Sequence, residues 1–155
     1  MILVFRLSRW LYVRKFPVIP AILKGINRIL FSVVLPPSAE IGKNVLFGYH
    51  GLGIVVHAKA VIGDRVKISP NVVIGGQGGG KSGVPIIEDD VIIGAGACLL
   101  GSIIVGRGAV IGANSVVLEN VPPHAVVVGV PARIVRLKGG EDPDRACRRM
   151  SSGSL

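Results

Sequence analysis

The stretch IEDDVI-IGAGAC-LLGSII-VGRGAV-IGANSV-VLENV, residues 87–121, repeats every six residues. Each group of six opens on an aliphatic residue: Ile87, Ile93, Leu99, Val105, Ile111 and Val117. A second series, four positions later, is small or apolar with one serine: Val91, Ala97, Ile103, Ala109, Ser115 and Val121. A period of six fits neither an α-helix nor a flat, half-buried strand. It is typical of a parallel β-helix built from hexapeptides.

The same period extends upstream with two interruptions. The earlier positions in the first series are Ile41, Phe47, Val56, Ile62, Ile68 and Ile74. The step from Phe47 to Val56 is longer than six residues, which indicates an insertion around residues 51–53. The step from Ile74 to Ile87 is longer still, and its insertion falls within residues 75–85. With three short strands per turn, the phased positions predict about four coils.

We expect three segments along the chain. Residues 36–136 form the β-helix domain, so the fold class is all-β apart from a short N-terminal helical segment. That segment, residues 1–35, is broken near Pro17 and Pro20, because proline ends helices. Residues 137–155 form a polar, Gly/Ser-rich tail that we expect to be poorly ordered.

The chain is basic, with a formal net charge of +9. Residues 1–39 hold six Lys or Arg residues and no acid. A basic chain can bind nucleic acid, an anionic membrane or a phosphorylated ligand. No nucleic-acid-binding motif is visible, so we expect no nucleic-acid partner. The two cysteines, Cys98 and Cys147, do not form a disulfide framework, which favours a cytoplasmic setting.

The N-terminal segment is neither a good signal peptide nor a spanning helix, because bases interrupt its apolar runs. Two interpretations stay open. Residues 1–35 could form a helical cap that packs on the first coil and on neighbouring subunits. They could also form a basic amphipathic segment that makes a peripheral contact with anionic lipid at the inner face of the membrane.

The chain has three histidines, and one of them lies at an interruption of the repeat. His50 falls in GYHGLG, residues 48–53, where small neighbours let the ring protrude into a cleft, so it is a candidate general base. His57 occupies a bend and is expected to be solvated, and His124 follows the last repeat. The second interruption holds GGQGGGKSG, residues 75–83, and such loops on a rigid scaffold commonly carry function.

Several of these stretches, in this order, resemble a known family. They are His50-Gly-Leu-Gly-Ile-Val-Val, Ala60-Val-Ile-Gly-Asp, Ile93-Gly-Ala-Gly-Ala, Ile111-Gly-Ala-Asn-Ser and Val121-Pro-Pro-His-Ala. Over residues 36–136 the chain is similar to the hexapeptide-repeat acyltransferases, and within them to the serine acetyltransferase-like branch. The resemblance implies a left-handed parallel β-helix, a homotrimer, and acetyl-CoA as the donor substrate without a metal.

The resemblance also implies roles for individual residues. His50 falls on the family's catalytic histidine. The donor-binding candidates are Gly76 with Gln77 beside it, Ala95 and Ala113 along the pantetheine arm, and Lys81 and Arg133 at the nucleotide phosphates. Tyr49 and His57 are the candidates for substrate binding on the acceptor side.

Departures from the serine enzymes guide the acceptor prediction. Tyr49 stands where their acid precedes the catalytic histidine, Val34 lies near the place of the orienting acid, and Gly83-Val84 replaces an Arg-His pair. An amino-acid substrate needs charged partners. We therefore expect O-acetylation of a sugar hydroxyl in cell-surface polysaccharide biosynthesis.

Four alternatives remain open at this stage. The first is L-serine O-acetylation in cysteine biosynthesis. The second is N-acetylation of an amino sugar, because the same base and donor site serve an amine. The third is a non-catalytic trimeric scaffold. The fourth is a metal-dependent enzyme similar to the γ-type carbonic anhydrases. It is disfavoured because the three histidines lack the close pair that such a zinc site requires.

Overall fold

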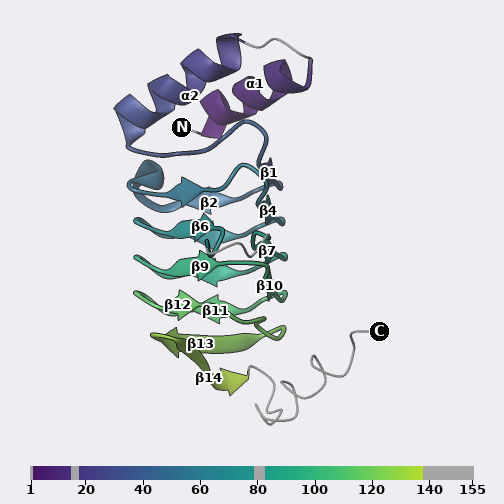
Figure 1. Ribbon diagram of the computed structural model, residues 1–155, viewed down its shortest axis with the longest axis vertical. Coiled ribbons are helices and arrows are strands. Elements are labelled where there is room, and N and C mark those ends of the chain that lie inside the picture. Colours follow the sequence, from purple (N-terminus) through teal and green to yellow (C-terminus); the bar gives the residue numbers. More distant parts are fainter. Residues whose placement is uncertain (1, 15–17, 79–82, 138–155) are drawn as a thin grey trace.

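The computed structural model describes residues 2–14, 18–78 and 83–137, and Figure 1 shows a stack of short strands beneath two helices. The helices α1 (Ile2–Val13) and α2 (Val18–Phe31) pack against each other at the N-terminal end of the stack. Lys81 and the predicted tail, except Leu137, lie outside the described residues.

The strands form three sheets, named here after their first strand. The β1 sheet holds β1 (Glu40–Ile41), β4 (Val61–Ile62), β7 (Ile86–Ile87) and β10 (Ile104–Val105). The β2 sheet holds β2 (Leu46–Phe47), β5 (Lys67–Ile68), β8 (Ile92–Ile93), β11 (Val110–Ile111), β13 (Ala125–Gly129) and β14 (Ala132–Leu137). The β3 sheet holds β3 (Val55–Val56), β6 (Val73–Gly75), β9 (Cys98–Leu100) and β12 (Val116–Val117). Paired strands are parallel, except that β14 runs antiparallel to β13.

The pairing register accounts for the six-residue period. Ile62 pairs with Ile87, Ile68 with Ile93, and Ile74 with Leu99, so each aliphatic residue stacks on its equivalent one coil away. From Val56 to Val117 this series is buried, whereas Ile41 and Phe47 in the first coil are only half-buried. The second series is buried as well. Its one polar member, Ser115, accepts a hydrogen bond at Oγ from the Gly129 N–H (3.1 Å).

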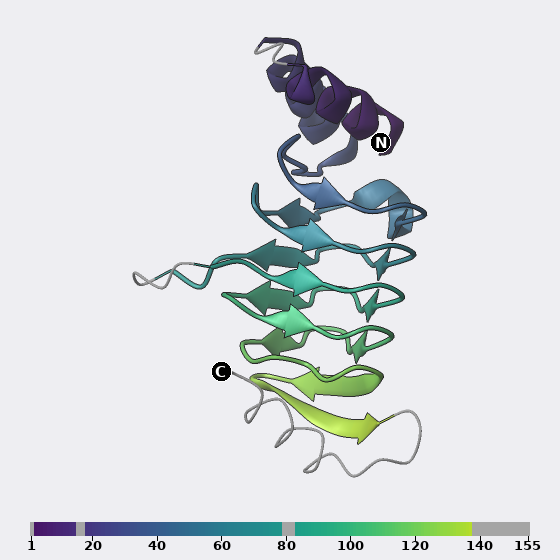
Figure 2. The same cartoon turned by 90° about the vertical axis from the view of Figure 1, so that its right-hand side faces the viewer.

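The stack has three corners, and each of them joins two of the sheets. The His50 corner joins the β2 sheet to the β3 sheet and contains residues 48–54, 69–72, 94–97 and 112–115. The charge corner joins the β1 sheet to the β2 sheet and contains residues 42–45, 63–66, 88–91 and 106–109. The remaining corner, here the loop corner, joins the β3 sheet to the β1 sheet, and Figure 2 shows the chain between β6 and β7 leaving the stack there.

Carboxylates and arginines link successive coils along the charge corner. Asp64 accepts the Lys43 N–H (2.7 Å), and Asp89 accepts the Asp64 N–H (2.9 Å). Arg65 donates to both oxygens of Asp90 at 2.7 and 2.8 Å. This hydrogen bond lowers the pKa of the Asp90 carboxyl and raises the pKa of the Arg65 guanidinium. The charges at this corner are therefore engaged in holding one coil to the next.

The first helix is anchored to the top coil. Phe5 is buried in the core, and the Arg6 Nη2 group donates to the Gly42 carbonyl (3.1 Å). Arg9 Nη1 donates to the carbonyls of Pro37 (3.5 Å), Ser38 (3.4 Å) and Ala39. Helix α1 therefore packs on the first coil, as one of the two interpretations of the N-terminal segment predicts.

Candidate functional site

The first insertion lifts His50 out of the coil. The short 3-10 helix η1 (Gly48–Gly51) follows β2, and within it Tyr49 and His50 both adopt left-handed backbone angles, with φ of 47° and 57°. Such angles are uncommon for residues other than glycine and concentrate at functional sites. Both side chains are exposed, and Tyr49 retains 83% of its accessible surface.

His50 lies beside a hollow of about 300 Å³ between this turn and the end of α2. The lining residues are Leu30, Phe31, Ser32, Tyr49, His50 and Leu52. The ring of Phe31 stacks on the imidazole, with centroids 6.4 Å apart and planes 22° from parallel. None of these six lining residues carries a carboxylate, and the Phe31 ring is their recorded contact with the imidazole.

The position near which the resemblance implies an orienting acid is part of the coil. The Val34 N–H donates to the Ile54 carbonyl (2.9 Å), and Val34 forms a parallel bridge with Val55. Its side chain is half-buried. A charge at this place would have to be desolvated beside the core, which is costly without a partner.

Ala95 and Ala113 lie at the same corner as His50, in the third and fourth coils. The Asn114 N–H donates to the Ala95 carbonyl (2.8 Å), so these turns stack directly on each other. A Cβ atom on Gly94 would lie 2.5 Å from the Ala113 nitrogen, so only glycine fits there. Three coil steps separate His50 from Ala113, roughly 14 Å at the usual strand spacing. The corner thus offers a surface of small side chains leading away from the imidazole.

Gly76, Gln77 and His57 lie at the loop corner, across the β3 sheet from His50. The Gly101 N–H donates to the Gly75 carbonyl (2.9 Å), which places Gly76 at this corner. His57 is exposed, and its Nδ1 accepts the Lys59 N–H (3.1 Å). Within one chain, therefore, the predicted substrate-binding pair is divided: Tyr49 adjoins His50, whereas His57 does not.

Arg133 and His124 lie elsewhere in the stack. Arg133 is exposed on β14, donates from Nη1 to the Ala132 carbonyl (3.0 Å) and comes within 3.9 Å of Glu119. His124 donates its N–H to the Arg107 carbonyl (2.8 Å), and its ring lies against Gly108 at the charge corner. Among residues 2–14, 18–78 and 83–137, no group of three His, Cys, Asp or Glu side chains is placed to hold a metal ion.

Sequence reasoning missed four of the six residues that line the hollow. Leu30 and Phe31 are the last residues of α2, Ser32 follows them, and Leu52 belongs to the insertion itself. The available signal was that the N-terminal segment ends immediately before the first coil, near the first insertion in space. The six-residue period does not predict that contact, because the helix ends at Phe31, before the period begins at Ile41.

Comparisons with known proteins agree on one group. A family model described as bacterial transferase hexapeptide (six repeats) matches residues 85–119. A serine acetyltransferase from Escherichia coli (strain K12) is 44% identical over 144 residues, which is 91% of this chain and 50% of that protein.

Two solved structures are also similar. The soybean serine acetyltransferase complexed with serine is 43% identical, has a TM-score of 0.79, and is matched over 85% of this chain and 54% of its own. The serine acetyltransferase from Brucella abortus strain S19 in complex with coenzyme A is 39% identical, has a TM-score of 0.84, and is matched over 89% and 55%. The chain spans about half the length of these relatives.

These relatives overturn the predicted sugar acceptor and its place in polysaccharide biosynthesis. They are serine acetyltransferases, which agrees with the alternative prediction of serine O-acetylation. The prediction was wrong because it treated the missing family residues at Tyr49, Val34 and Gly83-Val84 as evidence for another acceptor. An absent side chain removes one contact, but it does not identify what the site binds instead.

The repeats and the shared architecture confirm the predicted fold class. The fold is the predicted left-handed parallel β-helix of hexapeptide repeats with a short helical segment before it. By sequence and by structure, the chain is thus a hexapeptide-repeat protein similar to the serine acetyltransferase-like branch of the acyltransferases, as the motifs predicted.

Proposed function

We propose that this chain is an acetyl-CoA-dependent O-acetyltransferase that acetylates the hydroxyl of L-serine, with His50 as general base. The observation that carries the proposal is the position of His50. Its ring is exposed beside a hollow, on the same corner as Ala95 and Ala113, in a chain 44% identical to a serine acetyltransferase. Solved relatives in complex with serine and with coenzyme A support both substrates.

The proposed reaction needs one proton acceptor. The His50 imidazole takes the proton of the serine hydroxyl while that oxygen attacks the thioester carbonyl. The new C–O bond forms, the C–S bond breaks, and the departing thiolate receives the proton from the imidazolium. General-base help of this kind is worth roughly 10²–10⁴-fold in rate. Backbone N–H groups near the glycine-rich segment are the proposed donors to the oxyanion.

Small side chains make room for the donor substrate. Ala95 and Ala113 at the His50 corner, and Gly76 with Gln77 at the loop corner, are the proposed contacts of the pantetheine arm. Close approach of a ligand to the backbone requires such small side chains. Arg133 and Lys81 are the proposed partners of the nucleotide phosphates, because guanidinium and ammonium groups form charge-assisted hydrogen bonds with phosphate.

We propose that the chain forms a homotrimer. The His50 corner and the loop corner lie at opposite ends of the strands of the β3 sheet, and a neighbouring subunit would allow both kinds of corner to contact one ligand. We propose that the donor site lies between two subunits, one contributing the His50 corner and the other the loop corner. His57 of the neighbouring chain would then approach the acceptor. The charged groups that bind the ammonium and carboxylate of serine would also come from the neighbouring chain. The proposed setting is the cytoplasm, consistent with the free Cys98 thiol.

The acceptor is tested by direct competition. The purified chain is given acetyl-CoA with L-serine, or with a panel of glycans and amino sugars, and release of the free thiol is followed. Turnover is expected with serine and requires no glycan. Absence of serine turnover by a folded trimer that binds coenzyme A would overturn the proposed acceptor. Failure to bind coenzyme A at all would favour the scaffold alternative.

A further inference from the structure

The helix pair exposes an apolar surface at the N-terminal end of the molecule. On α1, the exposed positions Leu3, Arg6, Leu7, Trp10 and Val13 share one face by their helical spacing, and the exposed Arg14 follows directly after the helix. On α2, the exposed positions Ile19, Ile22, Ile26 and Ile29 form a stripe of the same kind. Leu3 and Ile29 retain 78% and 82% of their accessible surface. Apolar exposure of this extent marks an interaction surface.

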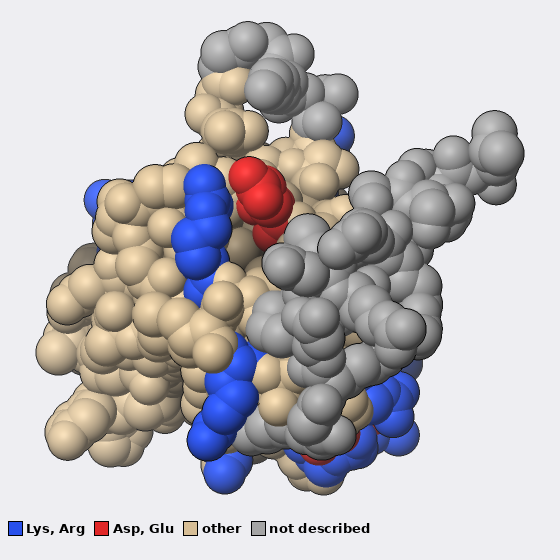
Figure 3. All heavy atoms as spheres, turned by 90° about the horizontal axis from the view of Figure 1, so that it is seen from below, with Lys and Arg blue, Asp and Glu red and all other residues tan. Residues whose placement is uncertain are grey.

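The charge around this surface has a single sign. Residues 1–39 hold six bases and no acid. Within the described ranges, no ion pair joins Arg6, Arg9 or Arg14 to a carboxylate. At the opposite end of the molecule, Figure 3 shows basic and acidic side chains near one another. The helix end therefore carries positive charge that no acid among residues 1–39 offsets.

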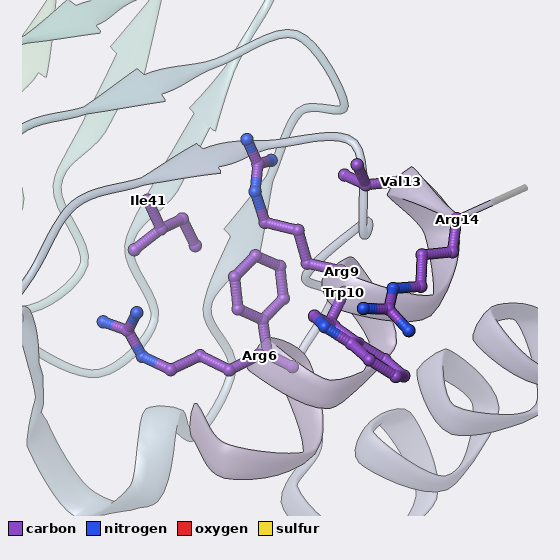
Figure 4. A pocket seen from close by; sticks show the side chains of 7 residues that line it. Arg6, Arg9, Trp10, Val13, Arg14 and Ile41 are labelled. Atoms are coloured by element: carbon purple, nitrogen blue, oxygen red, sulfur yellow. The ribbon is translucent and has the colours of Figure 1, made fainter.

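Arginines also surround a hollow between α1 and the first coil. Its volume is about 490 Å³, and its lining residues are Phe5, Arg6, Arg9, Trp10, Val13, Arg14 and Ile41 (Figure 4). The Arg14 guanidinium lies 3.8 Å from the centre of the Trp10 ring, a cation–π contact that holds it at the rim. A guanidinium group has five N–H donors. One nitrogen of Arg6 donates to the Gly42 carbonyl, so other N–H groups of this side chain are available to bind an oxyanion.

We propose that α1 and α2 dock this protein on an anionic phospholipid bilayer. The arginine hollow receives a headgroup phosphate, and the exposed aliphatic side chains of the two helices rest at the boundary with the acyl chains. Trp10 combines an apolar ring with a polar N–H, which suits that boundary. This inference is independent of the acetyl-transfer chemistry.

Charge disfavours a contact in which this surface of one copy meets the same surface of a second copy. Such a contact would bring arginines against arginines with no acid among residues 1–39 to separate them. An anionic bilayer supplies the opposite charge instead. The contact is interfacial, because none of the described helices is long and apolar enough to cross a membrane. At 1.5 Å per residue, α1 and α2 extend only about 18 and 21 Å, short of the ~30 Å hydrocarbon core.

The test is co-sedimentation of the full chain with vesicles of phosphatidylcholine alone or mixed with phosphatidylglycerol. Binding is expected only to the anionic vesicles, and it should weaken at high salt because exposed charges are screened. Inorganic phosphate at the same total charge should not displace the protein, since it lacks an apolar phase. Equal binding to both kinds of vesicle, no binding to either, or displacement by inorganic phosphate would overturn the proposal.

Substitutions locate the surface. Each arginine near an anionic surface is worth roughly a five-fold gain in partitioning, so R6Q with R14Q should weaken vesicle binding roughly 25-fold. The matched control is R136Q, which removes an exposed arginine from β14 at the other end of the stack. Unfolding midpoints check that each variant is folded. R136Q should bind anionic vesicles as the wild type does; a loss of roughly five-fold for R136Q, the full value for one charge, would show that only net charge matters and would contradict a built site.

A second pair of substitutions separates lipid from protein contacts. I22Q with I29Q removes exposed aliphatic side chains without removing charge. The expected result is weaker binding to anionic vesicles with an unchanged oligomeric state by sedimentation velocity. If the pair instead dissociates the oligomer and leaves vesicle binding intact, the stripe on α2 is a subunit interface and the bilayer proposal fails.

Discussion

The His50 corner and the charge corner belong to the same stack of coils but differ in how they treat the repeat. At the charge corner the six-residue spacing is unbroken, and Asp64, Arg65, Asp89 and Asp90 are bound from coil to coil. At the His50 corner the first coil carries an insertion, two residues with left-handed backbone angles, and an exposed imidazole. Charged residues within the regular repeat bind one coil to the next, whereas the His50 imidazole, which lies in the insertion, is exposed and makes no such link.

The largest effect is expected for the substitution His50→Ala, which tests this contrast at the His50 corner. We expect kcat to fall roughly 10²–10⁴-fold, because the general base is lost. The unfolding midpoint should stay the same, because the side chain is exposed. Thiol release from acetyl-CoA measures the rate. The matched control is His124→Ala at the charge corner, which should retain wild-type kcat. A pair of variants with equal rates would remove the distinction between the two corners.

A smaller effect is expected at Ala113, on the same corner as His50 but within the regular repeats. Ala113→Leu fills the surface proposed for the donor substrate. We expect KM for acetyl-CoA to rise about ten-fold, equivalent to about 1.4 kcal/mol, with little change in kcat. Ala113→Ser keeps the side chain small and should behave like the wild type. An unchanged KM for acetyl-CoA in the leucine variant would show that the donor substrate does not bind at this corner.

The smallest effect is expected at Asp90, where stability rather than activity should respond. The folded protein holds the Asp90 pKa below its ordinary value, so the ion pair with Arg65 stabilises the fold above a pH of about 4. That contribution is lost as the pH falls through the lowered pKa. Asp90→Asn should therefore slightly lower the unfolding midpoint at neutral pH, and the difference from wild type should vanish in acid. Thermal melts across this range measure it. A kcat changed as strongly as in His50→Ala would contradict a purely structural charge corner.

The repeat was enough to predict the coils, because each inward residue stacks on its own equivalent one turn away. Ile68, Ile93 and Ile111 lie in register in the β2 sheet, as their spacing predicted. The two interruptions were also visible as breaks in that spacing. The position of His50 on an exposed turn followed from the first of them.

The hollow beside His50 could not be predicted in the same way. It depends on Phe31, which ends a helix and stacks on a ring in the first coil. This contact joins two elements with different periods, so no single pattern contains it. The prediction of the acceptor substrate failed for a different reason. Tyr49 and Val34 show which family contacts are missing. The spacing of residues along one chain, however, does not show what a neighbouring subunit contributes to a site.

The antiparallel strand at the far end of the stack has a consequence for self-assembly. A solenoid of parallel strands ends in unpaired amides and carbonyls that could accept another molecule's coil and so begin a fibre. Here β14 folds back on β13 and reverses the strand direction, and it carries two exposed arginines, Arg133 and Arg136. A further parallel coil finds no matching direction there, and like charges oppose a second copy of the strand. The reversal therefore blocks parallel extension of the β2 sheet at this end of the stack.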